Sequence, residues 1–278
     1  PELNFEDVML TGLARDGGLY VPKEWPFFNE KAIIEMASCS YEEIAFTIMK
    51  PFIGSTFSDE EFKEIINKAY RGFGKEERCP LTNIGGKNFL LELYHGPTLA
   101  FKDVAMQLIG QMFELSLQRK SQKIVIVGAT SGDTGSAAIE AFRGLDSVEV
   151  FIMYPDGAVS EVQRRQMTTA VESNVNALAV DGNFDDCQSL LKEMFNDLDF
   201  RDEVNLASVN SINWARVMAQ VVYYFTSAIS LGAPKNKVNF TVPTGNFGDI
   251  FAGYVAKKMG LPIEKLIVAT NQNDILHR

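Results

Sequence analysis

Four short apolar runs rich in valine and isoleucine constrain the fold of this 278-residue chain more than any other feature. They lie at residues 123–127, 148–154, 175–180 and 204–209. Helical segments separate them, at about 134–143, 161–172 and 185–197. Apolar runs without an alternating polar face are typical of strands buried on both sides of a parallel sheet. Right-handed crossovers would place the helices on the two faces of that sheet. The sequence therefore predicts an α/β fold.

Helical patterns dominate the chain before about residue 78 and recur beyond it. The expected helices outside the apolar runs lie at residues 30–37, 41–52, 58–71, 103–119 and 214–231. Further strands are expected at residues 89–94, 238–242 and 266–270. Ser58 and Glu61 have the spacing of a capping box, which predicts the start of the third helix.

Composition excludes several classes of protein. A net charge of -10 argues against broad binding to nucleic acid or to an anionic membrane. The three cysteines lie far apart without a CxxC motif and are expected to be reduced thiols of a cytoplasmic protein. Two histidines are too few for a histidine-rich metal centre, and no apolar run is long enough to span a membrane.

The segment from His95 to Asp103, with the sequence HGPTLAFKD, presents Lys102 among apolar residues in a turn before a helix. A partly desolvated lysine loses some of its preference for the charged form and becomes a nucleophilic amine. Such an amine can form a Schiff base with an aldehyde cofactor. Lys102 is therefore a candidate catalytic residue. By itself the segment fits equally well a plain helix entry with Asp103 near the N-terminus.

Two glycine-rich turns follow strands, at the edge where an open α/β sheet binds ligands. Residues 128–135 read GATSGDTG, and residues 243–249 read PTGNFGD. Amides at a helix start favour an anion such as phosphate, although neither turn has a P-loop or GxGxxG pattern. The first turn also fits an ordinary connection capped by Asp133 or Thr134. In the second, we expect Asp249 to cap amides or orient the loop, because pointing inward it would repel a phosphate.

A fourth segment, SVNSINWAR at residues 208–216, offers amide and hydroxyl groups at a strand end and an arginine one turn into a helix. Arg216 could form paired, charge-assisted hydrogen bonds to a phosphate or carboxylate. The alternative is an Asn or Ser helix cap followed by a solvated arginine.

Together these segments resemble the threonine synthase family, pyridoxal-phosphate-dependent enzymes of the tryptophan-synthase-like fold. The resemblance covers nearly the whole chain, with motifs at residues 16–22, 95–103, 130–135, 210–216, 245–249 and 269–274. It implies parallel-rich sheets flanked by helices, with pyridoxal 5′-phosphate between two domains. A mainly helical region would span residues 1–78 and the catalytic core residues 79–278. Within the core, residues 104–218 would form the smaller domain, and residues 79–103 and 219–278 part of the larger one.

The resemblance also implies a role for each site residue. Lys102 would be the catalytic lysine and would hold the cofactor covalently. The other cofactor-binding residues would be Gly245, Asn246, Phe247, Gly248 and Asp249. The substrate would meet Ser131, Gly132, Asp133 and Thr134 near its carboxylate, and Asn210, Ser211 and Arg216 at its phosphate. Aspartate at position 133, where many related lyases carry asparagine, favours the threonine synthases.

The implied reaction converts O-phosphohomoserine and water to threonine and phosphate, the last step of threonine biosynthesis. A cytoplasmic monomer or homodimer is expected. Family members continue well beyond the position of Arg278, and that part supplies the partner of the pyridine nitrogen. The chain is therefore expected to be a fragment, with its C-terminal remainder absent.

Two alternatives remain open from the residues alone. One is another pyridoxal-phosphate lyase, such as a serine or threonine dehydratase or a threonine-synthase-like phospholyase. The other is a non-catalytic relative that keeps the fold to bind a ligand, although the presence of Lys102 and of the Gly245 loop argues against it.

Overall fold

The structure is a computed structural model that describes residues 2–12, 14, 18–207, 213–243 and 246–272. Its helices are α1 (Phe5–Thr11), α2 (Glu30–Met36), α3 (Tyr41–Ile53), α4 (Asp59–Tyr70), α5 (Lys102–Lys120), α6 (Asp133–Phe142), α7 (Glu161–Thr168), α8 (Phe184–Asn196), α9 (Leu198–Glu203), α10 (Trp214–Ser230) and α11 (Gly248–Lys258). Its strands are β1 (Leu81–Gly85), β2 (Asn88–Leu91), β3 (Ile124–Ala129), β4 (Val148–Pro155), β5 (Val175–Val180), β6 (Leu206–Ala207), β7 (Val238–Val242) and β8 (Ile263–Val268).

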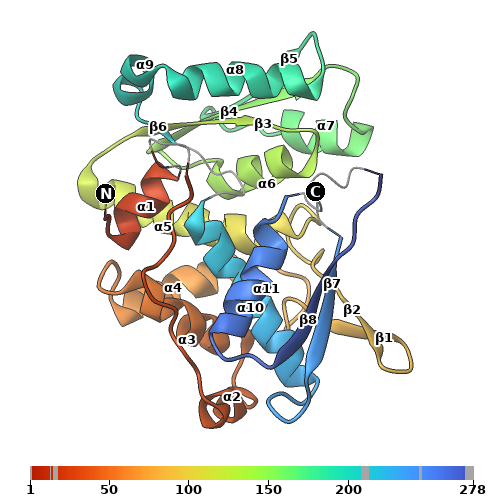
Figure 1. The fold of residues 1–278 in the computed structure, drawn as a ribbon. Helices are drawn as coiled ribbons and strands as arrows, with labels where there is room; N and C mark the ends of the chain where they lie inside the picture. The colour runs from red at the N-terminus through yellow and green to blue at the C-terminus, as the bar shows by residue number, and fades with distance from the viewer. Residues whose placement is uncertain (1, 13, 15–17, 208–212, 244–245, 273–278) are drawn as a thin grey trace.

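A four-stranded parallel sheet in the order β5-β4-β3-β6 forms one part of the molecule. Helix α8 covers one face of this sheet, and α6 lies on the other (Figure 1). The carboxyl end of β3 leads directly into the turn before α6, because the two elements are separated only by residues 130–132. The sheet therefore places that turn at its carboxyl edge, as expected for a ligand-binding α/β sheet.

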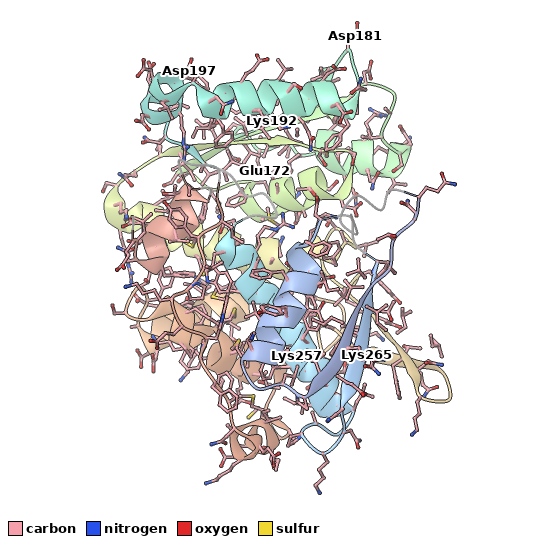
Figure 2. All side chains as sticks on the ribbon, in the orientation of Figure 1. Glu172, Asp181, Lys192, Asp197, Lys257 and Lys265 are labelled. Carbon is pink, nitrogen blue, oxygen red and sulfur yellow. The ribbon has the colours of Figure 1, made fainter. Side chains whose placement is uncertain are left out.

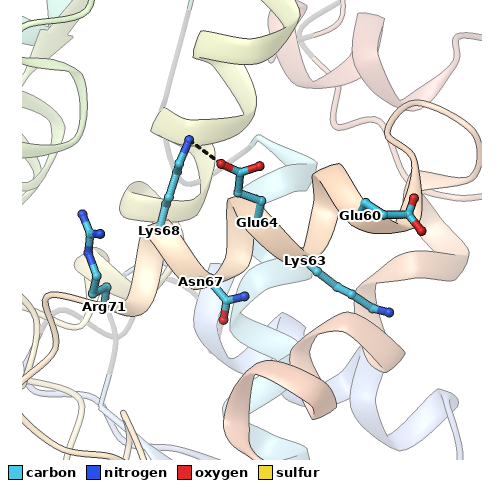
Figure 3. A pocket seen from close by; sticks show the side chains of 6 residues that line it. All are labelled: Glu60, Lys63, Glu64, Asn67, Lys68 and Arg71. Carbon is cyan, nitrogen blue, oxygen red and sulfur yellow. Dashed lines mark ion pairs between the residues drawn. The ribbon is translucent and has the colours of Figure 1, made fainter.

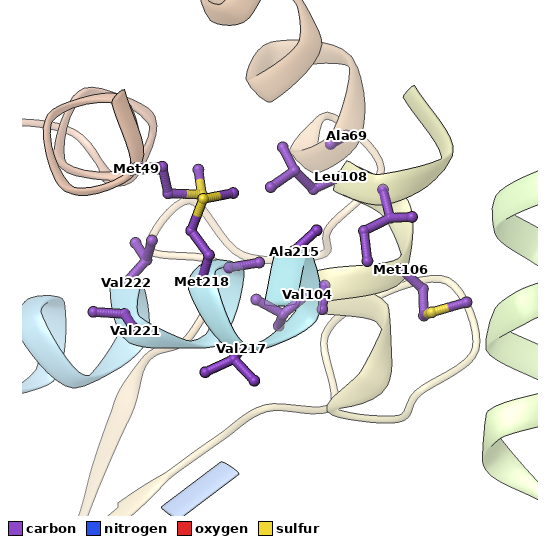
Figure 4. Close-up of a cluster of buried hydrophobic side chains, with 14 of the residues drawn as sticks. Met49, Ala69, Val104, Met106, Leu108, Ala215, Val217, Met218, Val221 and Val222 are labelled. Carbon is purple, nitrogen blue, oxygen red and sulfur yellow. The ribbon is translucent and has the colours of Figure 1, made fainter. Parts of the chain in front are cut away.

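Helices α3, α4, α5 and α10 pack together in the second part of the molecule, beside the parallel pair β7-β8 (Figure 1). Their contact is a continuous apolar core that includes Met49, Leu108 and Met218 (Figure 4). Helix α10 is buried around most of its circumference, so it serves as the central element against which the others pack. The first residues of α10, which include Arg216, are therefore fixed by the packing of the surrounding helices.

Local sequence signals explain where several helices begin. Ser40 and Glu43 form a complete capping box at α3, and Ser58 and Glu61 form one at α4. Each box satisfies amide groups that an isolated helix start would leave exposed. The helix start predicted at Ser58, now the start of α4, is confirmed. The mixed α/β architecture with a parallel sheet flanked by helices is confirmed as well.

The structure corrects several expected boundaries. The strand expected at residues 89–94 is β2, which ends at Leu91 and pairs antiparallel with β1, a strand that was not predicted. The sequence signal for this hairpin is the pair of consecutive glycines, Gly85 and Gly86. Both adopt positive φ angles where β1 turns into β2, which glycine does readily. Helices α1 and α9 were not predicted either, and α7 ends at Thr168 rather than near residue 172.

The burial of the parallel sheet also differs from the expectation. Strands β3 and β4 occupy the centre and have largely buried side chains, whereas β5 lies at the sheet edge and is partly exposed. An apolar run therefore indicated a strand correctly, but its position in the sheet decided how much of it is buried. Within residues 204–209, only Leu206–Ala207 form the described strand, and residues 208–212 lie outside the described part.

Charged side chains occupy the outer faces of both parts of the molecule. Asp181, Lys192 and Asp197 are exposed on the part containing the parallel sheet, and Lys257 and Lys265 on the helical part (Figure 2). Among the described helices, none combines the length and the apolar composition that a membrane span requires.

Candidate active site

The turn before α5 is built around a buried carboxylate. Asp103 accepts hydrogen bonds from the backbone N–H of Thr98 (2.8 Å) and from Thr98 Oγ1 (2.6 Å). A Cβ atom at Gly96 would lie 2.4 Å from Cβ of Asp103, so only glycine fits there. Asp103 thus holds the turn closed. Lys102 is the first residue of α5 and not part of a turn before it, which corrects the expected helix start at Asp103.

Lys102 lies in a partly desolvated position beside one carboxylate. Its side chain is 18% exposed, and its Nζ lies 3.3 Å from Oδ2 of Asp133. Burial lowers the pKa of Lys102; the carboxylate of Asp133 opposes this effect, and the positive charge of Arg216 adds to it. The same Nζ lies 4.4 Å from the ring centroid of Phe101. The fold therefore brings together Lys102, Asp133 and the charge of Arg216, which come from three different helices.

The turn between β3 and α6 is organised by the hydroxyl group of Thr130. Its Oγ1 accepts from the backbone N–H of Gly132 and of Gly135, each at 3.0 Å, and donates to the carbonyl of Gly132. Gly132 has a φ of 155°, and a Cβ at Gly135 would lie 2.5 Å from Cγ2 of Thr130. Both glycines are therefore required by the turn.

Asp133 does not cap α6. The residue before the helix is Gly132, and among the described residues no side chain caps this helix start. The alternative in which Asp133 or Thr134 serves as the cap is therefore wrong. Instead, the carboxylate of Asp133 contacts Lys102 and the side-chain amide of Gln163. Ser131 and Gly132 lie in the turn just before Asp133, and Thr134 follows Asp133 in the first turn of α6.

The start of α11 carries the second glycine turn. Gly245 lies outside the described residues, whereas Asn246 and Phe247 directly precede the helix and Gly248 begins it. The carboxylate of Asp249 points to α10, where Tyr223 and Tyr224 donate hydrogen bonds to its Oδ1. Burial raises the pKa of Asp249, and the two tyrosine hydroxyls counteract that effect. Among the described residues no side chain caps the start of α11, so the capping alternative for Asp249 is wrong, and its role in orienting the loop stays a prediction.

Arg216 lies in the first turn of α10 and is almost completely buried. Only 4% of its surface is exposed, so the alternative of a solvated arginine is wrong. Burial lowers the pKa of Arg216 to about 10, which keeps the guanidinium charged at neutral pH. Asn210 and Ser211, which the sequence placed in the same site, lie outside the described residues.

Asn213 links the start of α10 to the N-terminal region. Its Oδ1 accepts from the backbone N–H of Ala215 (2.9 Å), so the Asn helix cap that the alternative reading of this segment included is present. Its Nδ2 donates to the backbone carbonyl of Met9 over 2.9 Å. The sequence did not predict this second bond, because a contact across 204 residues leaves no local pattern. The contacts of Tyr223 and Tyr224 with Asp249, and of Gln163 with Asp133, also join distant parts of the chain, and the sequence did not predict them either.

A surface pocket away from Lys102 is not a better candidate for the active site. One of about 500 Å³ lies along the outer face of α4 and is lined by Glu60, Lys63, Glu64, Asn67, Lys68 and Arg71 (Figure 3). Its side chains come from α4 and from Arg71, the residue directly after that helix, and Lys68 pairs with Glu64 at 2.9 Å. In the described ranges, no group of three or more His, Cys, Asp or Glu side chains could hold a metal ion.

Two family models match the chain. Residues 1–70 match the model described as threonine synthase N terminus, and residues 78–278 match the model described as pyridoxal-phosphate dependent enzyme. The first match covers α1 to α4, and the second covers everything from β1 onward, including Lys102, Asp133 and Arg216.

Individual proteins are similar along the whole chain. The threonine synthase of Pseudomonas aeruginosa is 55% identical over 100% of this chain and 59% of its own length. The threonine synthase of Saccharomyces cerevisiae is 47% identical over 99% of this chain and 57% of its own length. The structure of pyridoxal-phosphate-bound threonine synthase from Brucella melitensis superposes with a TM-score of 0.95 at 58% identity, covering 99% of this chain and 60% of that one. The chain thus spans about three fifths of the length of these relatives.

Proposed function

We propose that this chain, which belongs to the pyridoxal-phosphate-dependent enzyme family and is similar to threonine synthases along its whole length, carries the catalytic lysine of a threonine synthase. The reaction would convert O-phosphohomoserine and water to threonine and phosphate. The observation that carries this proposal is the position of Lys102, which is partly desolvated, 3.3 Å from Asp133 and within the electrostatic influence of Arg216.

The described residues fit pyridoxal phosphate. Lys102 offers a primary amine whose pKa is lowered by burial, as a lysine that reacts with an aldehyde requires. The start of α11 offers a glycine turn for a phosphate, and the carboxylate of Asp249 is engaged by tyrosines of α10 instead of facing that turn. Asn246, Phe247 and Gly248, together with Gly245, would hold the cofactor phosphate.

Lys102 would move protons. When bound, pyridoxal phosphate supplies an electron sink for the pair released at the substrate Cα. The amine of Lys102 would take the Cα proton and return protons to the neighbouring carbons as phosphate leaves and water adds. The carboxylate of Asp133 lies 3.3 Å from Nζ of Lys102 and favours the protonated amine. Its negative charge would therefore stabilise the ammonium of Lys102 whenever the lysine carries the transferred proton.

Arg216 would recognise the phosphate of the substrate. Its guanidinium is buried and charged, and a planar fork of donors matches phosphate oxygens in pairs. As phosphate departs from Cγ, negative charge grows on the leaving oxygens, and a fixed positive group there lowers the barrier. Asn210 and Ser211 are proposed partners in this task, and Ser131, Gly132 and Thr134 would contact the substrate carboxylate.

The division of the chain remains part of the proposal. The N-terminal helical region would span residues 1–78, and a smaller domain at about 104–218 would be inserted into a larger one. The match of separate family models to residues 1–70 and 78–278 supports the first boundary. A cytoplasmic location and a monomeric or homodimeric state are likewise proposed.

The test is threonine formation from O-phosphohomoserine by the full-length protein loaded with pyridoxal phosphate, with the Lys102→Ala variant as control. Threonine and phosphate appearing in equal amounts, only with Lys102 present, would support the proposal. Phosphate with a keto acid would point to a phospholyase instead. A folded, cofactor-loaded protein without any product would favour a ligand-binding relative.

A further inference from the structure

Helix α7 contributes two glutamines to the surroundings of Lys102. Gln163 and Gln166 lie three residues apart, so they share the helix face that also carries the buried Met167. Met167 packs at the start of α6, since a Cβ on Gly135 would lie 2.7 Å from its sulfur. The inward face of α7 is thereby placed against the turn that carries Asp133.

Gln163 fixes the carboxylate of Asp133. Its Nε2 donates to Oδ1 of Asp133, while Oδ2 of the same carboxylate faces Lys102 at 3.3 Å. The hydroxyl of Ser160 donates to Oε1 of Gln163 over 2.9 Å. Because Ser160 occupies the amide oxygen, the amide nitrogen of Gln163 is the group that faces Asp133.

Gln166 reaches the other side of the site. Its Nε2 donates to the backbone carbonyl of Thr98 over 3.1 Å. Thr98 belongs to the turn that Asp103 closes in front of Lys102. One face of α7 therefore touches both segments that define the separation between Lys102 and Asp133.

We propose that Gln163 and Gln166 are positioning residues that hold Asp133 and the turn in front of Lys102, which contains Thr98, at a fixed separation. This inference rests on the proposed function for its meaning in catalysis, but the contacts themselves do not depend on the substrate. The side chain of Asp133 is 43% exposed, so without Gln163 its carboxylate has room to turn towards solvent.

The consequence concerns the proton on Lys102. The charged groups facing the lysine are Asp133 on α6, Arg216 on α10 and Asp103 on its own helix. Of these, Asp133 is partly exposed, whereas Arg216 and Asp103 are buried. Losing Gln163 would weaken the attraction of Asp133 for the ammonium, and the pKa of Lys102 would fall further.

Competitive acetylation of the full-length protein, freed of cofactor, measures this effect without any turnover. The labelling of Lys102 by acetic anhydride is followed against pH by peptide mass spectrometry. Gln163→Met, which keeps the side-chain length, should raise labelling at pH 7 about two- to fivefold, as expected for a partly exposed ion pair. Asp133→Asn should act in the same direction, and the double variant should match Asp133→Asn alone. Gln118→Met is the matched control, because Gln118 is an exposed residue in the last turn of α5 whose side chain hydrogen-bonds to Glu114 (3.4 Å), far along the helix from Lys102.

Gln166 is tested through the cofactor. Gln166→Met should weaken binding of pyridoxal phosphate about fivefold, the loss expected for one hydrogen bond. Thermal melting of the cofactor-free protein checks that the variant folds.

Unchanged Lys102 labelling in Gln163→Met, or effects that add to those of Asp133→Asn, would overturn the role of Gln163. An unchanged cofactor dissociation constant in Gln166→Met would overturn the role of Gln166. Both results are independent of whether the protein makes threonine.

Discussion

The hydroxyl of Tyr224 lies 3.0 Å from Oδ1 of Asp249 and 3.0 Å from the backbone carbonyl of the same residue. Tyr224 is on α10 and Asp249 is in the first turn of α11, directly after the turn proposed to hold the cofactor phosphate. Arg216, the proposed substrate-phosphate residue, lies two turns earlier on α10. One buried helix therefore connects the two proposed phosphate sites.

Removal of the Tyr224 hydroxyl should loosen the cofactor loop. Tyr224→Phe is expected to cost about 1.5–3 kcal/mol of stability, because a hydrogen bond to a buried carboxylate is lost. Binding of pyridoxal phosphate should weaken as well, which a fluorescence titration measures. Tyr254→Phe is the control, since Tyr254 lies on α11 with an exposed side chain. Equal cofactor affinity in both variants would show that Asp249 does not orient the loop.

Replacement of Lys102 should separate activity from stability. Burial lowers the pKa of Lys102 from its ordinary value of 10.5, so between the two values the unfolded chain binds more protons than the folded one. Stability conferred by this group therefore rises with pH through that window and is lowest below the folded-state pKa. Lys102→Met should lose at least about 1,000-fold in turnover, yet the cofactor-free protein should be more stable than the parent at pH 7.

Urea unfolding at pH 7 and pH 10 checks this sign. The advantage of Lys102→Met should shrink as the pH approaches 10.5, because the parent then loses its buried charge. Lys31→Met, at a position whose side chain is 85% exposed, should show no such change. A variant that is less stable than the parent at pH 7 and gains nothing at low pH would contradict the argument.

A lysine at position 216 should not restore the function of Arg216 in binding the substrate phosphate. Arg216→Lys keeps a positive charge but exchanges a planar fork of donors for a point charge. We expect kcat/KM for O-phosphohomoserine to fall about 10- to 100-fold, with the dissociation constant of pyridoxal phosphate nearly unchanged. Steady-state kinetics and cofactor titration give the two numbers. The conservative exchange Arg143→Lys, at a half-exposed ion pair with Glu140, serves as the control.

Asn174 should be important for stability and not for the reaction. Its Nδ2 donates to the carbonyls of Phe142 (2.9 Å) and Val148 (2.8 Å), and its Oδ1 accepts from the backbone N–H of Gly144 (2.8 Å). Asn174→Ala leaves these groups without that partner and is expected to cost about 2 kcal/mol. Chemical denaturation measures the loss, and Asn67→Ala on the exposed face of α4 should cost much less.

The sequence alone determined the elements that depend on local patterns. The capping box at Ser58 and the apolar runs of β3 and β4 specify a helix start and two central strands, because amide capping and burial on both faces are encoded within a few residues. Lys102 was also recognisable, since its apolar neighbours lie beside it in the chain. The Gly85-Gly86 turn of the β1-β2 hairpin carried a comparable signal.

Only the tertiary structure decided which groups meet. Asp133 faces Lys102 instead of capping α6, Arg216 is buried instead of solvated, and Asp249 turns to Tyr224. Each of these outcomes depends on the packing of helices far apart in the chain. Local chemistry selects which residues are able to react or bind, but the charge that a side chain carries and the direction in which it points depend on the neighbours that desolvate it, and those neighbours are assembled only when the chain folds.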